Sequence, residues 1–244
     1  MENEKKKSLI FIHGFKKHKE NIFQSLEEKL LQNDFFADFK IINLNYYDNL
    51  DKKSINNQLF KTIIIDKLEE LKDEDVFIVG YSVGGLVSLT LTQKYPNIKK
   101  IVALAPVYKI AFFSWPTKII NNYKTSLKIK KKVGKERYQR LKLLQKKGIS
   151  EKYPIRITTQ INYFRLKIRK QTKKLKEKDI LIIFSINDNI NNLTSSLKWF
   201  NKNFNYSDNK LQIHFSEETH NELISKKAKS NHFLIENFLM SEFD

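Results

Sequence analysis

The chain has 244 residues and a mass of 29.0 kDa, a length that can bury a large core in one α/β domain. It contains no cysteine, so disulfide bonds, zinc–thiolate sites and thiol nucleophiles are excluded, and we expect neither a metal ion nor another cofactor. The charged first residues lead into a short apolar strand, too short for a signal peptide or a membrane span. We therefore expect a cytoplasmic protein.

The formal net charge of +18 comes from one region of the chain. Residues 116–178 hold about half of the lysine and arginine residues, including every arginine, and only three acidic residues. Two interpretations stay open. The region is a functional basic surface, or its lysines reflect the codon usage of an A+T-rich genome.

Apolar strand patterns alternate with amphipathic helix patterns along most of the chain. This alternation predicts an α/β fold with a mostly parallel, doubly wound sheet of about six strands. The predicted elements are strands at 9–12, 40–44, 76–79, 101–106, 179–185 and 211–215, and helices at 21–32, 57–71, 83–95, 193–204 and 226–240.

One connection is too long for this pattern. Two parallel strands need a single crossover helix between them, yet the fourth and fifth strands are separated by about 70 residues. We therefore expect a core of residues 1–107 and 179–244, with a basic helical cap insertion at 108–178. A cap at the carboxyl ends of the strands covers an active site, so the aromatic side chains at its start are candidate substrate contacts: Phe112, Phe113 and Trp115.

The third strand runs into the G-x-S-x-G sequence Gly80–Gly84, after which a helix begins. In a strand–turn–helix of this kind, the two glycines leave room for a serine in a strained backbone conformation. Ser82 is therefore the predicted nucleophile. The N–H of Val83, at the start of the helix, is a predicted oxyanion donor, and Tyr81 is a candidate substrate contact.

A second oxyanion donor is predicted after the first strand. His13-Gly14 follows this strand directly and places the backbone N–H of Phe15 at the carboxyl edge of the sheet. Together with Val83, it gives a two-donor oxyanion hole. His18, in the polar loop that follows, is a further candidate for contact with the substrate.

An acid and a histidine follow the last two strands. Asp188 comes just after the fifth strand and His220 just after the sixth, which gives the order Ser, Asp, His with each residue at the carboxyl end of a strand. In this arrangement His220 is the general base and Asp188 orients its imidazole. The competing histidines lie in less suitable places, since His214 is inside the last strand and His232 is inside the last helix.

On these residues, the chain resembles the small carboxylesterase and monoacylglycerol lipase group of α/β-hydrolases, over nearly its whole length. The resemblance implies ester hydrolysis, oxyanion donors at Phe15 and Val83, and a small helical cap. The chain departs from the group at Asn45–Asp48, which replaces a Gly-His-Gly-like loop, in its basic cap, and in its missing or very short amino-terminal hairpin. The resemblance rests on Leu9–Phe15, Gly80–Gly85, Ala105–Tyr108, Ile182–Ile190 and Thr219–Leu223.

We therefore expect a serine hydrolase that cleaves short to medium acyl esters or monoacylglycerols through an acyl-enzyme on Ser82. Thioesterase and lysophospholipase activities are the alternatives within the enzyme class. The rival from another class is a non-catalytic binding module that uses the basic cap on an anionic membrane or on nucleic acid. Of these two partners we favour the membrane, because no nucleic-acid-binding motif is present. The expected interaction is a weak association with an anionic membrane surface.

Overall fold

Six parallel strands form the centre of the molecule in a computed structural model that describes residues 5–14, 21–44, 57–91, 94–108, 166–167, 170, 178–188, 190–203 and 211–241. The strand order is β2-β1-β3-β4-β5-β6, and each neighbouring pair is parallel. The predicted fold class is confirmed. The strands are β1 (Lys7–Ile12), β2 (Phe39–Leu44), β3 (Asp75–Tyr81), β4 (Ile98–Leu104), β5 (Asp179–Ser185) and β6 (Leu211–Ser216).

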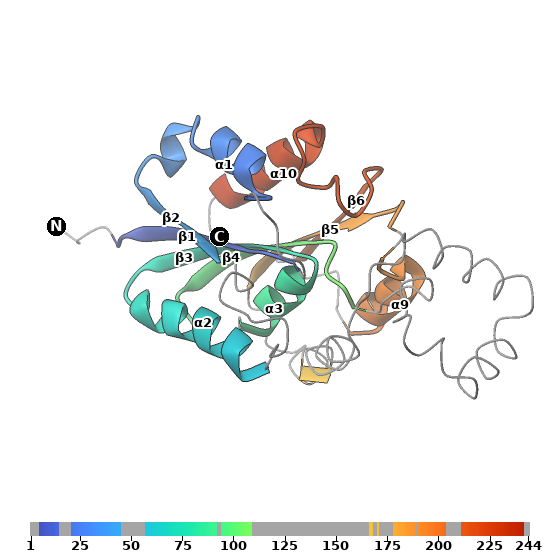
Figure 1. Cartoon of the computed structure of the whole chain (residues 1–244), viewed down its shortest axis with the longest axis horizontal. Helices are drawn as coiled ribbons and strands as arrows, with labels where there is room; N and C mark the ends of the chain where they lie inside the picture. The colour runs from blue at the N-terminus through green and yellow to red at the C-terminus, as the bar shows by residue number, and fades with distance from the viewer. Residues whose placement is uncertain are drawn as a thin grey trace, which may run out of the picture.

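Helices cover both faces of this sheet. Helices α1 (Gln24–Leu30) and α10 (Lys229–Met240) lie on one face, and α2 (Asn57–Glu70), α3 (Val83–Leu91) and α9 (Leu193–Asn203) lie on the other (Figure 1). A short 3₁₀ helix at Asp34–Phe36 follows α1. Strands β3, β4 and β5 are largely apolar, apart from Lys99 and Lys100 in β4, as expected of strands with both faces buried.

Alternate residues of each central strand enter two separate hydrophobic clusters. In β3, Val76 and Ile78 pack in the cluster that contains α2 and α3, whereas Phe77 and Val79 pack in the cluster that contains α1 and α10. The period of two along a strand produces this division. A shift of β3 by one residue would exchange the two sets, so the hydrophobic side chains fix the strand register.

The order of the strands determines where a site can form. From β1 the chain moves to β2 on one side and then to β3 on the other, so β1 and β3 flank the point at which the order reverses. In parallel α/β sheets, ligands bind outside the carboxyl ends of the strands near this point. The residues after β1, β3, β5 and β6 all lie at this edge.

The helix that follows β3 approaches β1 very closely. All nine residues of α3 are buried, and a Cβ atom on Gly84 would lie 2.2 Å from the carbonyl oxygen of Ile12 and 2.5 Å from that of His13. Because both of these atoms belong to the backbone, no side chain fits at position 84. The start of α3 is thereby held directly against the end of β1.

A buried lysine ties the far end of α10 to the sheet. Lys100 in β4 is fully buried, and its Nζ donates to the carbonyl oxygen of Phe238 at 2.8 Å, to the hydroxyl of Ser241 at 2.7 Å and to the Ser241 carbonyl. Burial lowers the pKa of Lys100, which the negative charge of Asp179 opposes. The ammonium group satisfies carbonyl oxygens that the last turn of a helix leaves without partners.

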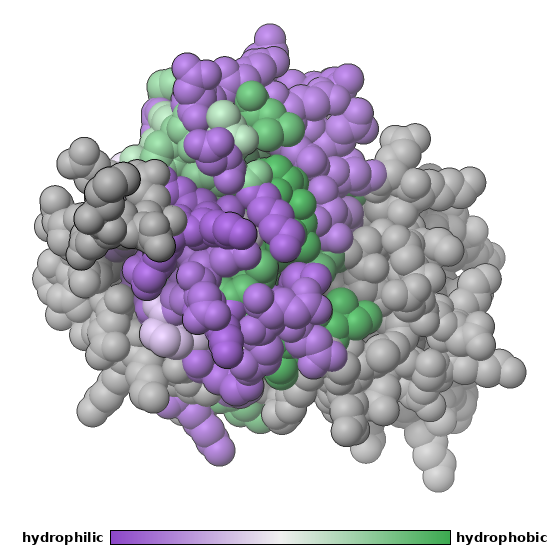
Figure 2. Space-filling model, turned by 90° about the vertical axis from the view of Figure 1, so that its left-hand side faces the viewer, coloured by the Kyte–Doolittle hydropathy of each residue, from purple (hydrophilic) through white to green (hydrophobic). Residues whose placement is uncertain are grey.

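The end of the molecule on the left of Figure 1 carries hydrophobic residues in a band between hydrophilic ones (Figure 2). Among the described residues, Leu31 and Phe35, which follow α1, are large hydrophobic residues that are exposed. Phe35 packs against Phe36 and Phe39, and the ammonium group of Lys7 lies 5.3 Å from the centre of the Phe35 ring. The cation–π contact lets a charged side chain cover part of an aromatic surface.

The predicted insertion at 108–178 lies almost entirely outside the described residues. The chain enters it at Tyr108, which is buried, and returns at Lys178, directly before β5. The prediction of a helical cap therefore stays a prediction.

Candidate active site

The turn after β3 holds Ser82 in a conformation that few residues other than glycine adopt. Its φ is 57°, in the left-handed region, as the sequence predicted for a strained turn. Three backbone hydrogen bonds maintain this conformation: the Ser82 N–H donates to Leu104, and the Ser82 carbonyl accepts from Leu86 and Val107. The neighbouring segments thus determine the conformation of the turn.

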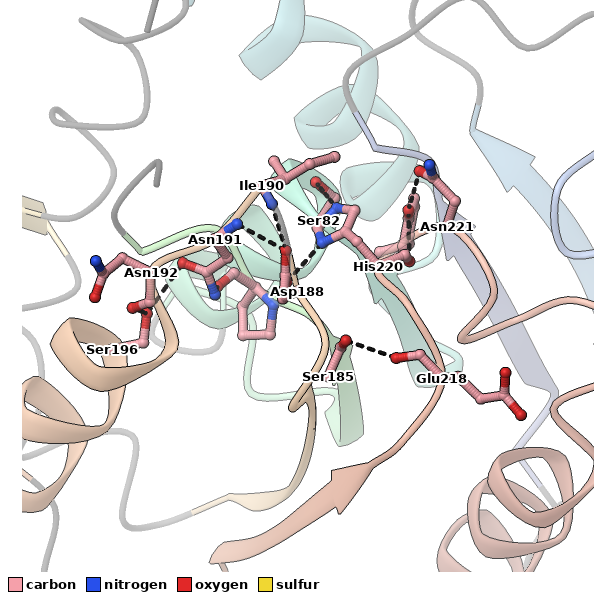
Figure 3. A network of polar contacts seen from close by, with 12 residues as sticks. Ser82, Ser185, Asp188, Ile190, Asn191, Asn192, Ser196, Glu218, His220 and Asn221 are labelled. Carbon is pink, nitrogen blue, oxygen red and sulfur yellow. Dashed lines mark hydrogen bonds and ion pairs between the residues drawn. The ribbon is translucent and has the colours of Figure 1, made fainter. Parts of the chain in front are cut away.

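His220 lies beside this serine, although it comes from the loop after β6. Its Nε2 is 3.1 Å from Oγ of Ser82, and its Nδ1 is 2.7 Å from Oδ2 of Asp188 (Figure 3). The side chains of His220 and Asp188 are each only 2% exposed. One imidazole therefore connects a hydroxyl on one side with a carboxylate on the other, away from water.

The backbone after β5 holds the carboxylate of Asp188. Its Oδ1 accepts from the N–H groups of Ile190 and Asn191 at 2.8 and 2.7 Å, so only Oδ2 is directed at His220 (Figure 3). Aspartate commonly makes such bonds to the residues two and three positions further on. The local chain thus orients the acid before any distant contact is made.

A buried asparagine joins the acid loop to the loop after β4. Nδ2 of Asn191 donates to the carbonyl oxygen of Pro106 at 3.1 Å, and its Oδ1 accepts from the hydroxyl of Ser196, also at 3.1 Å. Val107, the next residue after Pro106, donates its N–H to Ser82. Hydrogen bonds and the Pro106–Val107 peptide bond therefore connect the turn at Ser82 with Asp188. No pattern in the sequence indicated this connection.

Polar side chains from several elements fix the loop that carries His220. Ser185, at the end of β5, donates to the Glu218 carbonyl at 2.6 Å, and Asn187 donates to the Glu217 carbonyl at 2.6 Å. From α10, Asn231 donates to the carbonyl of Leu223 at 3.1 Å. The acid loop and the histidine loop therefore support each other. Polar residues just past β5 were the only sign of this in the sequence.

Tyr81 has a different place from the predicted one. The sequence suggested a substrate contact, whereas the structure buries Tyr81 and directs its hydroxyl to the carbonyl oxygen of His220, 2.9 Å away. Its ring also packs against Gly14. The Tyr81 side chain therefore lies between Gly14, after β1, and His220, after β6.

The remaining predicted site residues divide into two groups. Val83 begins α3, and the first N–H groups of a helix lack an intrahelical acceptor, so its N–H is suited to bind an oxyanion. The others lie outside the described residues: Phe15, His18, Phe112, Phe113 and Trp115.

The competing histidines lie away from the site, in the elements predicted for them. His214 is exposed on β6, and His232 is buried in α10, with its Nε2 3.4 Å from the carbonyl oxygen of Ile224. Burial lowers the pKa of His232; the bond to Ile224 opposes this effect and the charge of Lys29 adds to it. Neither histidine replaces His220 in the site.

The described part of the chain shows neither a metal-binding cluster nor a membrane-spanning helix. Three or more His, Asp or Glu side chains do not gather there in a way that could hold a metal ion. Among the same residues, no helix is long and apolar enough to cross a membrane.

A sequence profile of one protein family matches residues 57–223 of the chain, the part that contains Ser82, Asp188 and His220. The family is described as serine aminopeptidase, S33. The chain belongs to this family. No curated protein matches the chain in sequence. The S33 match and the six-stranded sheet together make the protein an α/β-hydrolase, as the resemblance in the sequence indicated.

Solved structures of other α/β-hydrolases share the fold of this S33 family member. The monoacylglycerol lipase of Paleococcus ferrophilus is 16% identical with a TM-score of 0.67, and the match covers 95% of this chain and 93% of that chain. The esterase Pf2001 of Pyrococcus furiosus is 14% identical with a TM-score of 0.62, over 97% and 83% of the two chains. Est1E of Butyrivibrio proteoclasticus is 15% identical with a TM-score of 0.56, over 98% and 91%.

Proposed function

We propose that this S33 family member is a serine hydrolase that cleaves carboxylic esters, either short to medium acyl esters or monoacylglycerols, through an acyl-enzyme on Ser82. One observation carries the proposal. His220 lies 3.1 Å from the Ser82 hydroxyl through Nε2 and 2.7 Å from the Asp188 carboxylate through Nδ1. A nucleophile, a base and an orienting acid in this order are what acyl transfer requires.

In the first half of the reaction, Nε2 of His220 takes the proton of the Ser82 hydroxyl while Oγ attacks the ester carbonyl carbon. The carbonyl oxygen becomes an oxyanion, which the N–H of Val83 and, by expectation, that of Phe15 stabilise. Asp188 keeps the proton on Nδ1 and stabilises the imidazolium. As the carbon–oxygen bond of the ester breaks, His220 gives its proton to the leaving alcohol.

In the second half, water takes the place of the alcohol. His220 accepts one proton from the water as its oxygen attacks the acyl carbon, and then returns the proton to Oγ of Ser82. The carboxylic acid leaves and the free serine is restored. No atom outside the three side chains, the backbone donors and water is needed.

The names of the relatives bear on the leaving group. The structural neighbours include an esterase and a monoacylglycerol lipase, which supports an ester substrate, whereas the name of the family points to an amino-terminal peptide bond. Both reactions use the same acyl-enzyme and differ in whether an alcohol or an amine leaves. An aminopeptidase is therefore the second candidate, beside thioesterase and lysophospholipase activity.

The test combines a covalent label with a substrate series. A fluorophosphonate probe is expected to label the peptide that contains Ser82, and the label is expected to be lost in Ser82→Ala but kept in Ser230→Ala, a serine exposed on α10. Aryl esters of increasing chain length, a monoacylglycerol, a thioester, a lysophospholipid and an aminoacyl anilide then compare the substrate classes. If the folded wild-type protein takes no label at Ser82, the proposal of a serine hydrolase fails and the non-catalytic binding module becomes the favoured hypothesis.

A further inference from the structure

Tyr81 is the last residue of β3 and directly precedes Ser82, and it is only 5% exposed. Its hydroxyl lies 2.9 Å from the carbonyl oxygen of His220 and 3.4 Å from Oδ1 of Asn221. A phenol has one proton to donate, and the nearer acceptor, the carbonyl oxygen of His220, forms the stronger hydrogen bond. The hydroxyl therefore holds the backbone of the residue that carries the imidazole.

The ring of Tyr81 fills the space between three segments of the site. A Cβ atom on Gly14 would lie 2.9 Å from Cδ1 of Tyr81 and 3.0 Å from Cβ of Ser82, so both residues pack directly against the backbone after β1. On the other side, the centre of the Tyr81 ring is 5.2 Å from that of the His220 imidazole. One rigid side chain thus contacts the segments after β1 and β6 and belongs to the segment that carries Ser82.

We propose that Tyr81 is a positioning residue that fixes the His220 imidazole relative to the Ser82 hydroxyl. This inference rests on the proposed function, because it assigns Tyr81 a role in the same reaction. His220 and Ser82 are 138 residues apart in the chain, whereas Tyr81 is bonded covalently to one and by a hydrogen bond to the other. The tyrosine gives the two reacting groups a short and stiff connection.

Catalysis depends on this connection because the reaction requires the two groups in line at hydrogen-bonding distance. A displacement of about 1 Å in such a site can lower the rate by about 10². Tyr81 acts through the backbone of His220 and not on the substrate. Its loss is therefore expected to lower kcat and leave KM unchanged, whereas loss of a substrate contact raises KM.

The test removes one oxygen atom. Tyr81→Phe keeps the ring against Gly14 and deletes the hydroxyl, and we expect kcat for an aryl ester to fall about ten-fold with KM within about two-fold. The rate of fluorophosphonate labelling at Ser82 is expected to fall by the same factor. Replacement of Tyr81 by 4-aminophenylalanine restores an N–H donor at the same place and is expected to recover most of the rate.

The matched control is Tyr95→Phe. Tyr95 is also buried, and its hydroxyl bonds to Glu69 at 2.9 Å, beyond the other end of α3. This variant is expected to change the melting temperature as Tyr81→Phe does, with kcat unchanged. Equal kcat values for Tyr81→Phe and the wild type, or a rise in KM alone, would overturn the inference.

A measurement without turnover separates this inference from the proposed function. In ¹⁵N-histidine NMR, the Nδ1 proton of His220, held by Asp188, is expected to exchange with water faster in Tyr81→Phe than in Tyr95→Phe. Unchanged exchange, together with unchanged labelling, would count against a positioning role. If the wild type neither hydrolyses esters nor takes the label, the proposed function fails, whatever the NMR result.

Discussion

The carboxylate of Asp188 lies 2.7 Å from Nδ1 of His220, and both side chains are almost fully buried. The other carboxylate oxygen accepts from two backbone N–H groups, so the acid has little freedom to turn. Nδ1 must carry a proton to donate to this carboxylate. Nε2, which faces Ser82, is then left as the acceptor, the tautomer that a general base needs.

The first prediction concerns this acid. Asp188→Asn keeps the shape of the side chain but removes the charge and lets the amide favour the wrong tautomer, so kcat is expected to fall by about 10⁴ with little change in KM. Steady-state hydrolysis of an aryl ester measures both constants. Asp179→Asn, at the opposite edge of the sheet, is the control with normal activity. An active Asp188→Asn enzyme would mean that a different residue is the acid.

The second prediction concerns Asn191. In Asn191→Ala the Pro106 carbonyl and the Ser196 hydroxyl each lose one partner but keep another, in the Tyr108 N–H and the Asn192 carbonyl, and each lost hydrogen bond costs about 0.5–1.5 kcal/mol. The free energy of unfolding is expected to fall by this amount and kcat by about ten-fold. The control is Asn192→Ala, which removes a side-chain cap from Ser195 at the start of α9, a loss of about 1 kcal/mol, without lowering kcat. Equal kcat in the two variants would refute the link to the acid.

The third prediction concerns the contact of α3 with β1. Gly84→Ala places a methyl group 2.2 Å from the Ile12 carbonyl, and relief requires the backbone to move, so we expect a loss of stability of about 3 kcal/mol or more and loss of activity. Urea denaturation measures the stability, and hydrolysis of an aryl ester measures the activity. Ser88→Ala, in the same helix, removes one hydroxyl that bonds to the Gly84 carbonyl and is expected to cost about 1 kcal/mol.

The fourth prediction concerns pH. Burial holds the pKa of His232 below its ordinary value of 6.5, so the unfolded chain binds a proton at His232 more readily than the folded protein. The contribution of neutral His232 to the free energy of unfolding is fully present above pH 6.5. It is lost as the pH falls through the lowered pKa of His232 in the folded protein. Melting temperatures between pH 7.5 and 5.5 are expected to fall less in His232→Gln than in the wild type. Exposed His214, changed to Gln, is the control that keeps the wild-type slope.

The fifth prediction comes from the charge distribution. Residues 116–178 hold 22 of the 45 Lys and Arg residues but only three of the 27 Asp and Glu residues. The rest of the chain has 23 basic and 24 acidic residues and is therefore nearly neutral. Codon usage alone would enrich lysine everywhere. Each basic residue near an anionic membrane contributes about 1 kcal/mol at low salt, and screening reduces this attraction. We propose weak, salt-sensitive binding to anionic vesicles.

Vesicle flotation tests this proposal. Binding to anionic but not to neutral vesicles, lost near about 0.5 M salt and weakened by the triple change of Lys130, Lys131 and Lys132 to Gln, would support it. These lysines lie outside the described residues. Equal binding to both kinds of vesicle, or none, would leave codon usage as the explanation.

The sequence predicted the elements of the core well because their patterns are local. The six strands lie within three residues of their predicted ends, and α2 and α9 within one. Helix α10 begins at Lys229, later than the predicted 226, since the turns that position the histidine loop occupy the residues before it. The 3₁₀ helix at Asp34–Phe36 was not predicted because three residues are too few to show a period.

In the site, the sequence predicted the side chains that end strands but not those that hold them in place. The sequence predicted Ser82, Asp188 and His220, which the structure brings together, because each follows a strand of a parallel sheet. Tyr81 and Asn191 make their important bonds to backbone carbonyls far away in the chain, and a carbonyl is present at every residue. Such bonds leave no pattern in the sequence, so only the folded structure identifies them.

The site is built from contacts between segments far apart in the chain, and this has a consequence for refolding. The bonds Ser82–His220, Tyr81–His220 and Asn191–Pro106 span 138, 139 and 85 residues. After dilution from denaturant, we expect helices to form early and circular dichroism to recover before the sheet has its final strand order. The proposed ester hydrolysis requires β3, β4, β5 and β6 side by side. The return of activity therefore reports complete assembly of this part of the sheet, and the delay between the two signals measures the time that long-range strand pairing takes.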